Sequence, residues 1–186
     1  MINQFLIVGL GNPGSQYAFS RHNAGFLFLD KLAEKFNVTF QSKDFLSFCK
    51  FQCNDSVVFL LKPQTYMNLS GKAVGFLKSF YKINADNIIV FHDDIDLEFA
   101  RCKLKFAGGN GGHNGLKDID KFISNQYWRF RFGVGRPNNN DNVSSYVLSD
   151  FSLDELDIIK KNSEVVFNNF EFFLKKDQQK ISSLFK

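Results

Sequence analysis

The order of strand and helix signals along this chain predicts an α/β protein with a three-layer α/β/α fold, in which helices flank a mixed, mostly parallel twisted sheet. Two observations predict this class. Short apolar runs bounded by glycine or polar residues, which are typical of buried strands, alternate with longer segments of helical periodicity. Two strand-like segments also lie on either side of Asn54-Asp55, a turn signal that indicates a hairpin, so we expect antiparallel pairs as well.

The first half of the chain supplies the hairpin, one further strand and two helices. The apolar run 5–10 predicts a buried strand, and apolar residues spaced three or four apart over 24–36 predict a helix after a polar loop. Segments 45–53 and 56–61 are the two arms of the hairpin. A second helix is expected over 70–81, because its apolar residues again share one face.

The second half continues the alternation of strands and helices. The apolar run 87–92 predicts another buried strand, whereas 101–106 and 128–135 alternate basic with apolar residues and are expected to be strands with one polar face. A helix is expected over 115–124, between these two strands. The tail, about 152–186, is expected to be helical and evenly charged, with six acidic and six basic residues.

Length and composition are those of one globular domain. The chain has 186 residues, of which 44% are hydrophobic and 23% charged, so we expect a single domain over 1–186. Its start has no basic segment, and no apolar run approaches the roughly 18 residues of a membrane span, which predicts a cytoplasmic protein without a membrane partner. Cys49 and Cys53 have no second cysteine pair or nearby histidine to complete a zinc site, and we expect no metal.

The positive charge is concentrated in one region of the sequence. The net charge of the whole chain is only +4, but the segment 101–136 contains eight basic and two acidic residues. A local excess of this size attracts polyanions such as nucleic acid. Without a further pattern, a solvated surface would explain the same charges.

The segment 9–14 formally satisfies the glycine pattern of dinucleotide-binding proteins, G-x-G-x-x-G. That pattern requires a helix to begin at the third glycine and an acidic residue to end the next strand. Here Pro13 removes one amide, the polar stretch 15–23 separates the glycines from the helix, and Asp30 and Glu34 lie inside the helix. We therefore favour another use of these glycines, and keep a nucleotide-dependent enzyme as an alternative.

His22 is the expected general base. It lies just before the helix predicted over 24–36, and histidine is the side chain best suited to proton transfer near neutral pH. Asp93, at the end of a separate strand, can orient its imidazole, and a His–Asp pair without an obvious nucleophile indicates activation of water. His92 and His113 are rival candidates. His92 should point away from Asp93 along the strand, and His113 is expected to be a loop contact.

Three asparagines lie in loops with residues of special geometry. Asn12, Asn68 and Asn114 stand in Gly-Asn-Pro-Gly, Met-Asn-Leu-Ser-Gly and His-Asn-Gly. Each by itself is typical of a turn or a helix cap. Ligands of such folds bind beyond the carboxyl ends of the strands, where Asn12, Asn68 and Asp93 are expected to converge. Amides placed there supply neutral hydrogen bonds to an acyl oxygen or a peptide group.

Basic residues alternate on two of the predicted strands. Arg101, Lys103 and Lys105 share one face of the first strand, and Arg129 and Arg131 share one face of the second. Two such strands would form a positive strip beside the glycine-rich loop, residues 108–115. A strip of this kind suits phosphates better than bases, so we expect recognition of a nucleic-acid backbone.

Taken together, the chain resembles the bacterial peptidyl-tRNA hydrolases. The stretches that carry the resemblance, which run through most of the chain up to about residue 150, are 8–14, Tyr17, 21–25, 62–71, 92–97, 108–117 and 131–135. The resemblance implies hydrolysis of the ester bond that joins a peptide to the terminal ribose of tRNA, which recycles the tRNA. It also implies a protein that needs no cofactor, acts as a monomer, and contacts the acceptor stem and 3′ end of its substrate.

The resemblance assigns roles residue by residue. It implies that His22 is the catalytic base and Asp93 the carboxylate that orients it, while Asn12 helps to distinguish blocked from free aminoacyl-tRNA. The residues implied to bind substrate or tRNA are Tyr17, Tyr66, Met67, Asn68, Gly112, His113, Asn114, Lys103, Lys105 and Arg131. Many relatives have Phe where this chain has Tyr66.

One rival interpretation belongs to a different functional class. A non-catalytic RNA-binding protein on the same fold would keep the basic strip, but His22 and Asp93 would be dispensable in it. The presence of both residues favours the enzyme.

Overall fold

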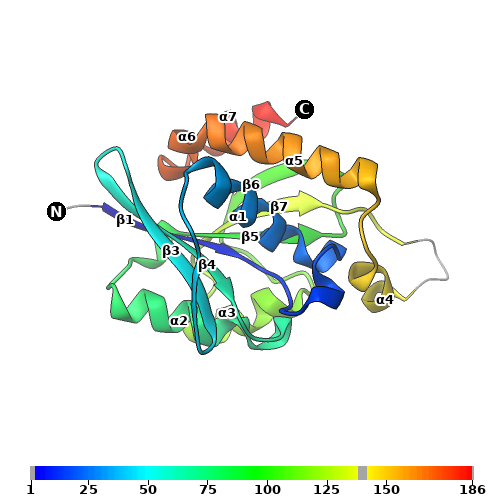
Figure 1. The fold of residues 1–186 in the computed structure, drawn as a ribbon, viewed down its shortest axis with the longest axis horizontal. Coiled ribbons are helices and arrows are strands. Elements are labelled where there is room, and N and C mark those ends of the chain that lie inside the picture. Colours follow the sequence, from blue (N-terminus) through cyan, green and yellow to red (C-terminus); the bar gives the residue numbers. More distant parts are fainter. Residues whose placement is uncertain (1–2, 138–141, 186) are drawn as a thin grey trace.

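The computed structural model describes residues 3–137 and 142–185. Its core is a seven-stranded sheet with helices on both faces (Figure 1). The strands are β1 (Asn3–Gly9), β2 (Gln41–Lys43), β3 (Leu46–Cys53), β4 (Ser56–Pro63), β5 (Ile88–Asp94), β6 (Cys102–Phe106) and β7 (Trp128–Gly133). The helices are α1 (Ala24–Lys35), α2 (Ser70–Phe80), α3 (Asn114–Ile123), α4 (Val143–Leu148), α5 (Leu153–Asn168), α6 (Phe170–Leu174) and α7 (Gln178–Leu184). Among the described helices, none is long and apolar enough to cross a bilayer.

The sheet is mixed, as predicted, with a parallel centre and antiparallel edges. Parallel and antiparallel strand pairs are equal in number, so the sheet is not mostly parallel as expected. Its strand order is β2-β3-β4-β1-β5-β7-β6. The pairs β1–β4, β1–β5 and β5–β7 are parallel, whereas β2–β3, β3–β4 and β6–β7 are antiparallel. The hairpin is confirmed, and Asn54 turns its corner with a φ of 51°. Strand β2 was not predicted, because its three residues are all exposed and show no apolar alternation.

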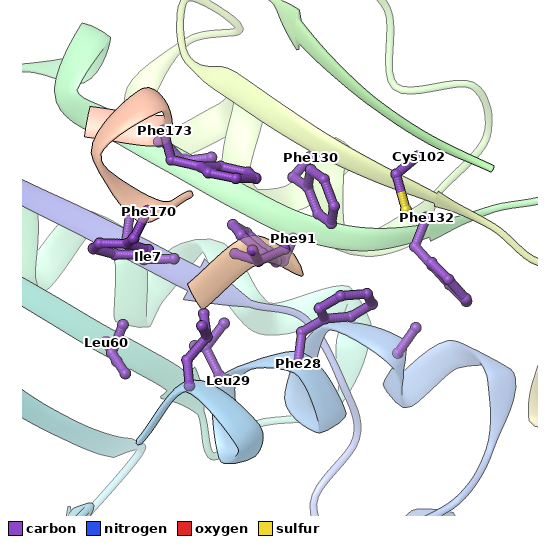
Figure 2. Close-up of a cluster of buried hydrophobic side chains, with 14 of the residues drawn as sticks. Ile7, Phe28, Leu29, Leu60, Phe91, Cys102, Phe130, Phe132, Phe170 and Phe173 are labelled. Atoms are coloured by element: carbon purple, nitrogen blue, oxygen red, sulfur yellow. The ribbon is translucent and has the colours of Figure 1, made fainter. Parts of the chain in front are cut away.

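Helices cover the two faces of the sheet as separate layers. In Figure 1, α1 and the C-terminal helices α5, α6 and α7 lie on one side of the sheet, and α2 and α3 lie on the other. Phenylalanine fills much of the first interface, where Phe28, Phe91, Phe130 and Phe132 are essentially inaccessible and pack ring against ring (Figure 2). Ten of the 24 phenylalanines of this chain are buried in its core, whereas five, including Phe76 and Phe80, are exposed.

The glycines of segment 9–14 allow α1 to pack directly on the end of β1. A Cβ at Gly9 would overlap the carbonyl oxygen of Gly25, and a Cβ at Gly11 would lie 2.6 Å from the Phe26 ring. The amide of Phe26 also donates to the Leu10 carbonyl at 3.2 Å. Because protein atoms fill the space beside these glycines, the motif is explained by close packing, which supports the preference against a dinucleotide.

This packing predicts a large effect of a single methyl group at Gly25. Its Cβ would overlap the Leu10 amide nitrogen and the Phe91 carbonyl oxygen, which are backbone atoms with little freedom to move. We expect Gly25→Ala to lower the free energy of unfolding in urea by about 1–3 kcal/mol. As a matched control, Gly109→Ala adds a methyl group that meets no described atom within 4 Å, and should stay within about 0.5 kcal/mol of wild type. Equal effects of the two substitutions would contradict the packing argument.

Candidate active site

A cavity of about 780 Å³ opens where the parallel strands end. Residues from β5, β6, β7, α3, α4 and the loops before α1 and α2 line it. The predicted site residues that line this cavity are Asn12, His22, Tyr66, Met67, Asn68, Asp93, Lys105, Gly112, His113, Asn114 and Arg131. Two others, Tyr17 and Lys103, lie outside its lining. The fold thus gathers in one place most of the residues that the sequence analysis selected.

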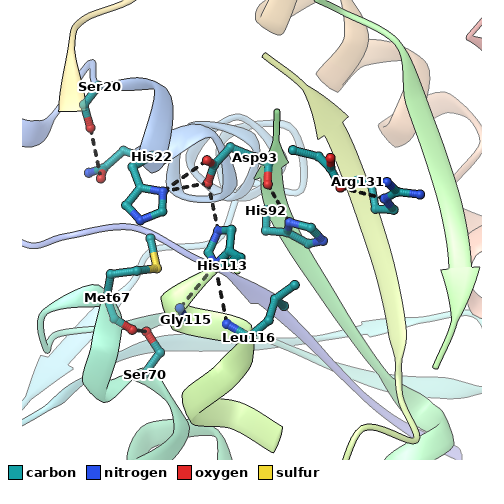
Figure 3. Close-up of polar contacts among 12 residues, drawn as sticks. Ser20, His22, Met67, Ser70, His92, Asp93, His113, Gly115, Leu116 and Arg131 are labelled. Atoms are coloured by element: carbon teal, nitrogen blue, oxygen red, sulfur yellow. Dashed lines mark hydrogen bonds and ion pairs between the residues drawn. The ribbon is translucent and has the colours of Figure 1, made fainter. Parts of the chain in front are cut away.

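The carboxylate of Asp93 lies at the centre of the site and binds two imidazoles. Its Oδ1 is 2.9 Å from His22 Nδ1 and 2.9 Å from His113 Nε2 (Figure 3). The residue is only 3% exposed, and its strand β5 is hydrogen-bonded on both sides, to β1 and β7. Burial raises the pKa of Asp93, but the two imidazoles outweigh burial and hold that pKa below its ordinary range. The carboxylate is therefore ionised at neutral pH.

The bond to Asp93 determines which nitrogen of His22 is available for chemistry. Because Nδ1 donates to the carboxylate, Nε2 is the ring nitrogen left to accept a proton. Burial lowers the pKa of His22, whereas the charge of Asp93 and its hydrogen bond raise it, and the net effect is a pKa above 6.5. Such an imidazole is a stronger base than free histidine.

His113 contributes more than the predicted loop contact. Its Nδ1 accepts hydrogen bonds from the amides of Gly115 at 3.1 Å and Leu116 at 3.4 Å, which caps the start of α3. This capping leaves the proton on Nε2, so the ring donates to Asp93. This bond was not predicted from the sequence. A histidine directly before a helix was a local sign of the cap, but nothing local indicated the carboxylate.

His92, the other rival base, is poorly suited to that role. Its side chain does not reach the carboxylate of Asp93 within the described structure, as predicted; its Nδ1 donates instead to the Asp93 carbonyl oxygen at 2.6 Å. The ring is 3% exposed, and burial together with His113 lowers its pKa to about 3. A base this weak accepts a proton much less readily at neutral pH than His22.

The three predicted asparagines converge on the cavity. Asn12 Oδ1 accepts a hydrogen bond from the Met67 amide at 2.7 Å, which leaves its Nδ2 as a donor at the cavity wall. Asn68 belongs to a short 3-10 turn, η3 (Met67–Leu69), and Asn114 begins α3. Both are exposed in the cavity, so donors and acceptors on neutral amides surround the His–Asp pair.

The basic strip differs from the prediction in how its residues are used. Lys105 faces Arg129 across the β6–β7 ladder, on the face of the sheet that the cavity exposes. Arg129, however, is 3% exposed and donates to the carbonyls of Gly108 at 2.9 Å and Gly109 at 2.5 Å, so it holds the glycine-rich loop. Arg131 forms an ion pair with Asp94 at 2.7 Å. Burial thus makes one cation of the strip structural.

Helix α4 is a wall of the cavity that the sequence analysis missed. The run of polar residues 138–142, whose composition indicates a loop, lies outside the described residues except for Asn142. The Asn142 side chain caps α4 by accepting from the Ser144 amide at 2.8 Å. Val143 and Val147 of this helix line the cavity. The cap followed by valines four residues apart was the available signal, but it covers fewer than two helical turns.

Arg21 ties this wall, and the start of α5, to the segment that carries His22. Arg21, the first residue of the 3-10 turn η2 (Arg21–Asn23), binds both carboxylate oxygens of Glu155 at 3.1 Å. Its guanidinium also donates to the Asp150 carbonyl at 3.1 Å and stacks on Tyr146. The base and the α4 side of the cavity are therefore held together across more than 120 residues of sequence.

The geometry of the central trio also resembles a metal-ligand set. One donor atom from each of His22, Asp93 and His113 lies within 4.8 Å of the others. The same nitrogens already donate protons to the carboxylate, and the remaining nitrogen of His113 caps α3. A cation would have to replace both of these protons, so the arrangement fits hydrogen bonding better than coordination.

Comparisons with known proteins agree on one family. The family model described as "Peptidyl-tRNA hydrolase" matches residues 6–186. The peptidyl-tRNA hydrolase of Rickettsia canadensis is 47% identical over 175 residues, covering 90% of this chain and 92% of that protein, and the one of Rickettsia akari is 44% identical over 185 residues, covering 96% and 97%. A crystal structure of peptidyl-tRNA hydrolase from Acinetobacter baumannii superimposes with a TM-score of 0.90 at 35% identity, covering 100% of this chain and 95% of that one.

The contact between His22 and Asp93 predicts a specific titration behaviour. We expect the pKa of His22, measured from its ring protons by NMR, to lie above 6.5 in the wild type. In Asp93→Asn it should fall below 6.5, because burial then acts without the compensating charge. His92 serves as an internal reference, since its lowered pKa keeps it neutral in both proteins above about pH 5. An unchanged His22 pKa in the variant would contradict the assigned electrostatics.

Proposed function

This chain belongs to the peptidyl-tRNA hydrolase family and is a hydrolase of peptidyl-tRNA, and from this premise we propose that His22 is the general base of the reaction. The observation that carries the proposal is the bond of His22 Nδ1 to a buried, ionised carboxylate, which leaves Nε2 to the cavity. In the described structure, no serine, threonine or cysteine side chain forms a hydrogen bond with the His22–Asp93 pair.

The proposed reaction is attack of water on the ester carbonyl. Nε2 of His22 takes one proton from the water while the oxygen bonds to the carbonyl carbon, and the resulting imidazolium faces the negative charge of Asp93. The tetrahedral intermediate then collapses, the bond to the ribose oxygen breaks, and the same proton passes to that oxygen. The products are a peptide with a free carboxyl group and a tRNA with a free terminal hydroxyl, and no metal is needed for these steps.

The second imidazole on Asp93 supports this scheme. His113 donates to the same oxygen that His22 contacts, so the carboxylate stays ionised and fixed when the charge of His22 changes. A group that is already oriented does not have to reorganise when positive charge develops beside it. We therefore assign His113 to orienting Asp93, in addition to the substrate contact that the resemblance implies.

The amides are proposed to hold the acyl group. Asn12 Nδ2 is directed to the cavity because its Oδ1 is occupied by Met67, so it donates to the carbonyl oxygen on which charge develops. Asn68 and Asn114 are exposed in the cavity and contact the peptide group and the attacking water. Tyr66 and Met67, which line the same side, and Tyr17 are proposed to contact the peptidyl and 3′-terminal parts of the substrate.

The tRNA is proposed to bind through its phosphates at the β6–β7 side of the cavity. Lys105 is exposed there beside the glycine-rich loop, and Arg131 and Lys103 stand opposite each other in the ladder. This arrangement favours contact with the acceptor stem and 3′ end without reading of base sequence. We further propose a cytoplasmic enzyme that acts as a monomer.

Replacement of the base should separate catalysis from binding. We expect His22→Ala to lower the turnover of N-acetyl-aminoacyl-tRNA by about 10²–10⁴-fold, the usual contribution of a positioned general base. Affinity for deacylated tRNA should stay within a few-fold of wild type, since His22 is not one of the cations. The assay measures release of the blocked amino acid in the presence of a chelator.

Three other outcomes would overturn parts of this scheme. Equal turnover of wild type and variant would rule out His22 as the base. If the chelator abolished wild-type turnover and a divalent metal restored it, the reaction would require a metal and the metal-free scheme would be wrong. Binding of tRNA without turnover in either protein would favour the rival RNA-binding function.

Removal of a phosphate contact should act on binding and its salt dependence. We expect Lys105→Ala to weaken binding of deacylated tRNA and to reduce the slope of log affinity against log salt by about one. Lys50→Ala is the matched control, because Lys50 is an exposed lysine on β3, near the opposite edge of the sheet. A variant of Lys105 with unchanged affinity but lower turnover at saturating substrate would show that this lysine serves catalysis instead.

A further inference from the structure

Asn23 occupies a helix-cap position but does not cap the helix. It directly follows His22 and precedes the first residue of α1, where an asparagine side chain ordinarily accepts a hydrogen bond from the first helical turn. No side-chain cap bond forms here, although the residue is only 2% exposed. A buried amide needs partners, so its hydrogen bonds must be made elsewhere.

The side chain of Asn23 instead pairs with the whole backbone unit of Asn12. Its Oδ1 accepts from the Asn12 amide at 2.8 Å, and its Nδ2 donates to the Asn12 carbonyl oxygen at 2.9 Å. The hydroxyl of Ser20 adds a third, longer bond of 3.3 Å to the same Oδ1. Because Asn23 bonds to both the amide and the carbonyl of Asn12, it restrains the position and the rotation of the Asn12 backbone, as a neighbouring strand does in a sheet.

The chain of bonds continues beyond Asn12. The side-chain oxygen of Asn12 accepts from the Met67 amide at 2.7 Å, so three segments distant in sequence are joined: η2, the loop after β1, and η3. His22 lies immediately before Asn23, and Asn68 lies immediately after Met67. The buried side-chain amide of Asn23 therefore connects the segment of His22 to the segments that carry Asn12 and Asn68.

We propose that Asn23 is a positioning residue, which sets the place of the Asn12 side-chain amide relative to His22. The inference rests on the proposed function, in which Asn12 contacts the acyl group and Asn23 does not. The physical reason is that Asn12 lies in the loop of segment 9–14, where three glycines leave the backbone freer, and that His22 and Asn12 reach the same reacting group from different segments. Misplacement of a catalytic group by about 1 Å costs on the order of 10²-fold in rate.

A double-mutant cycle tests whether Asn23 acts through Asn12. We expect Asn23→Ala to lower kcat/KM for N-acetyl-aminoacyl-tRNA by about 10²-fold in the wild-type background. In an Asn12→Ala background the same change should cost no more than about twofold, because the group that it positions has been removed. The same fold loss in both backgrounds would overturn the proposal. A shift in the acid limb of the pH–rate profile would also overturn it, since that shift places the effect on His22.

Two further variants keep the test sound. Asn162→Ala is the matched control: Asn162 is a partly buried asparagine on α5 that donates to the Ala100 carbonyl at 3.2 Å, and its loss should be additive with Asn12→Ala. If Asn23→Ala does not fold, as judged by thermal melting, Asn23→Asp takes its place in the cycle, since it retains the acceptor and loses the donor.

An activity-independent measurement distinguishes this inference from the proposed function. We expect hydrogen exchange at the Met67 amide to be faster in Asn23→Asp than in wild type, because the variant loses the donor to the Asn12 carbonyl and the Met67 bond depends on the placement of Asn12. Unchanged exchange at Met67 would show that Asn23 does not restrain the Asn12 side chain, whatever the activity. An inactive wild type would contradict the proposed function and leave this readout intact.

Discussion

A buried carboxylate that must be compensated is the constraint on which this site depends. Removing the charge of Asp93 from water is costly unless donors surround it, and His22 and His113 supply them. Those two bonds fix the tautomers of both rings. They also connect the strand that carries Asp93 to the start of α1 through His22, and to the start of α3 through His113, so the chemistry and the local architecture share one interaction.

Close backbone packing brings the partners of that carboxylate within reach. Gly9 and Gly25 have no side chains at the point where α1 crosses the end of β1, and this lets the loop with Asn12 lie against the turn with His22. From the other side, the pairing of Arg21 with Glu155 attaches the C-terminal region to the same turn. The candidate active site therefore lies where several segments meet, each of them held by the core, and groups held in this way need little reorganisation.

The charges around the cavity are divided between structure and binding. Arg129 and Arg131 alternate on β7, but the buried Arg129 donates its hydrogen bonds to the carbonyls of the glycine-rich loop. Arg131 is partly neutralised by Asp94, and Lys105 is exposed at the rim. A count of basic residues thus overstates the positive surface, because hydrogen-bonded and buried cations do not contribute to phosphate binding as exposed ones do.

The sequence by itself determined the α/β class, the hairpin and, to within two residues, the ends of the strands that it predicted, because periodicity, glycine and turn residues act locally. It also selected His22, Asp93 and the cavity asparagines, since residue types suited to proton transfer and hydrogen bonding followed those ends. Only the tertiary structure decided that His113 shares Asp93, that Arg129 is internal, and that Asn23 binds Asn12. The physical reason is the sequence separation of the partners. Asp93 bonds to His22, 71 positions away, and to His113, 20 positions away. No local pattern encodes which distant group satisfies a buried donor or acceptor. The short elements β2 and α4 were missed for the related reason that their stability comes from neighbours.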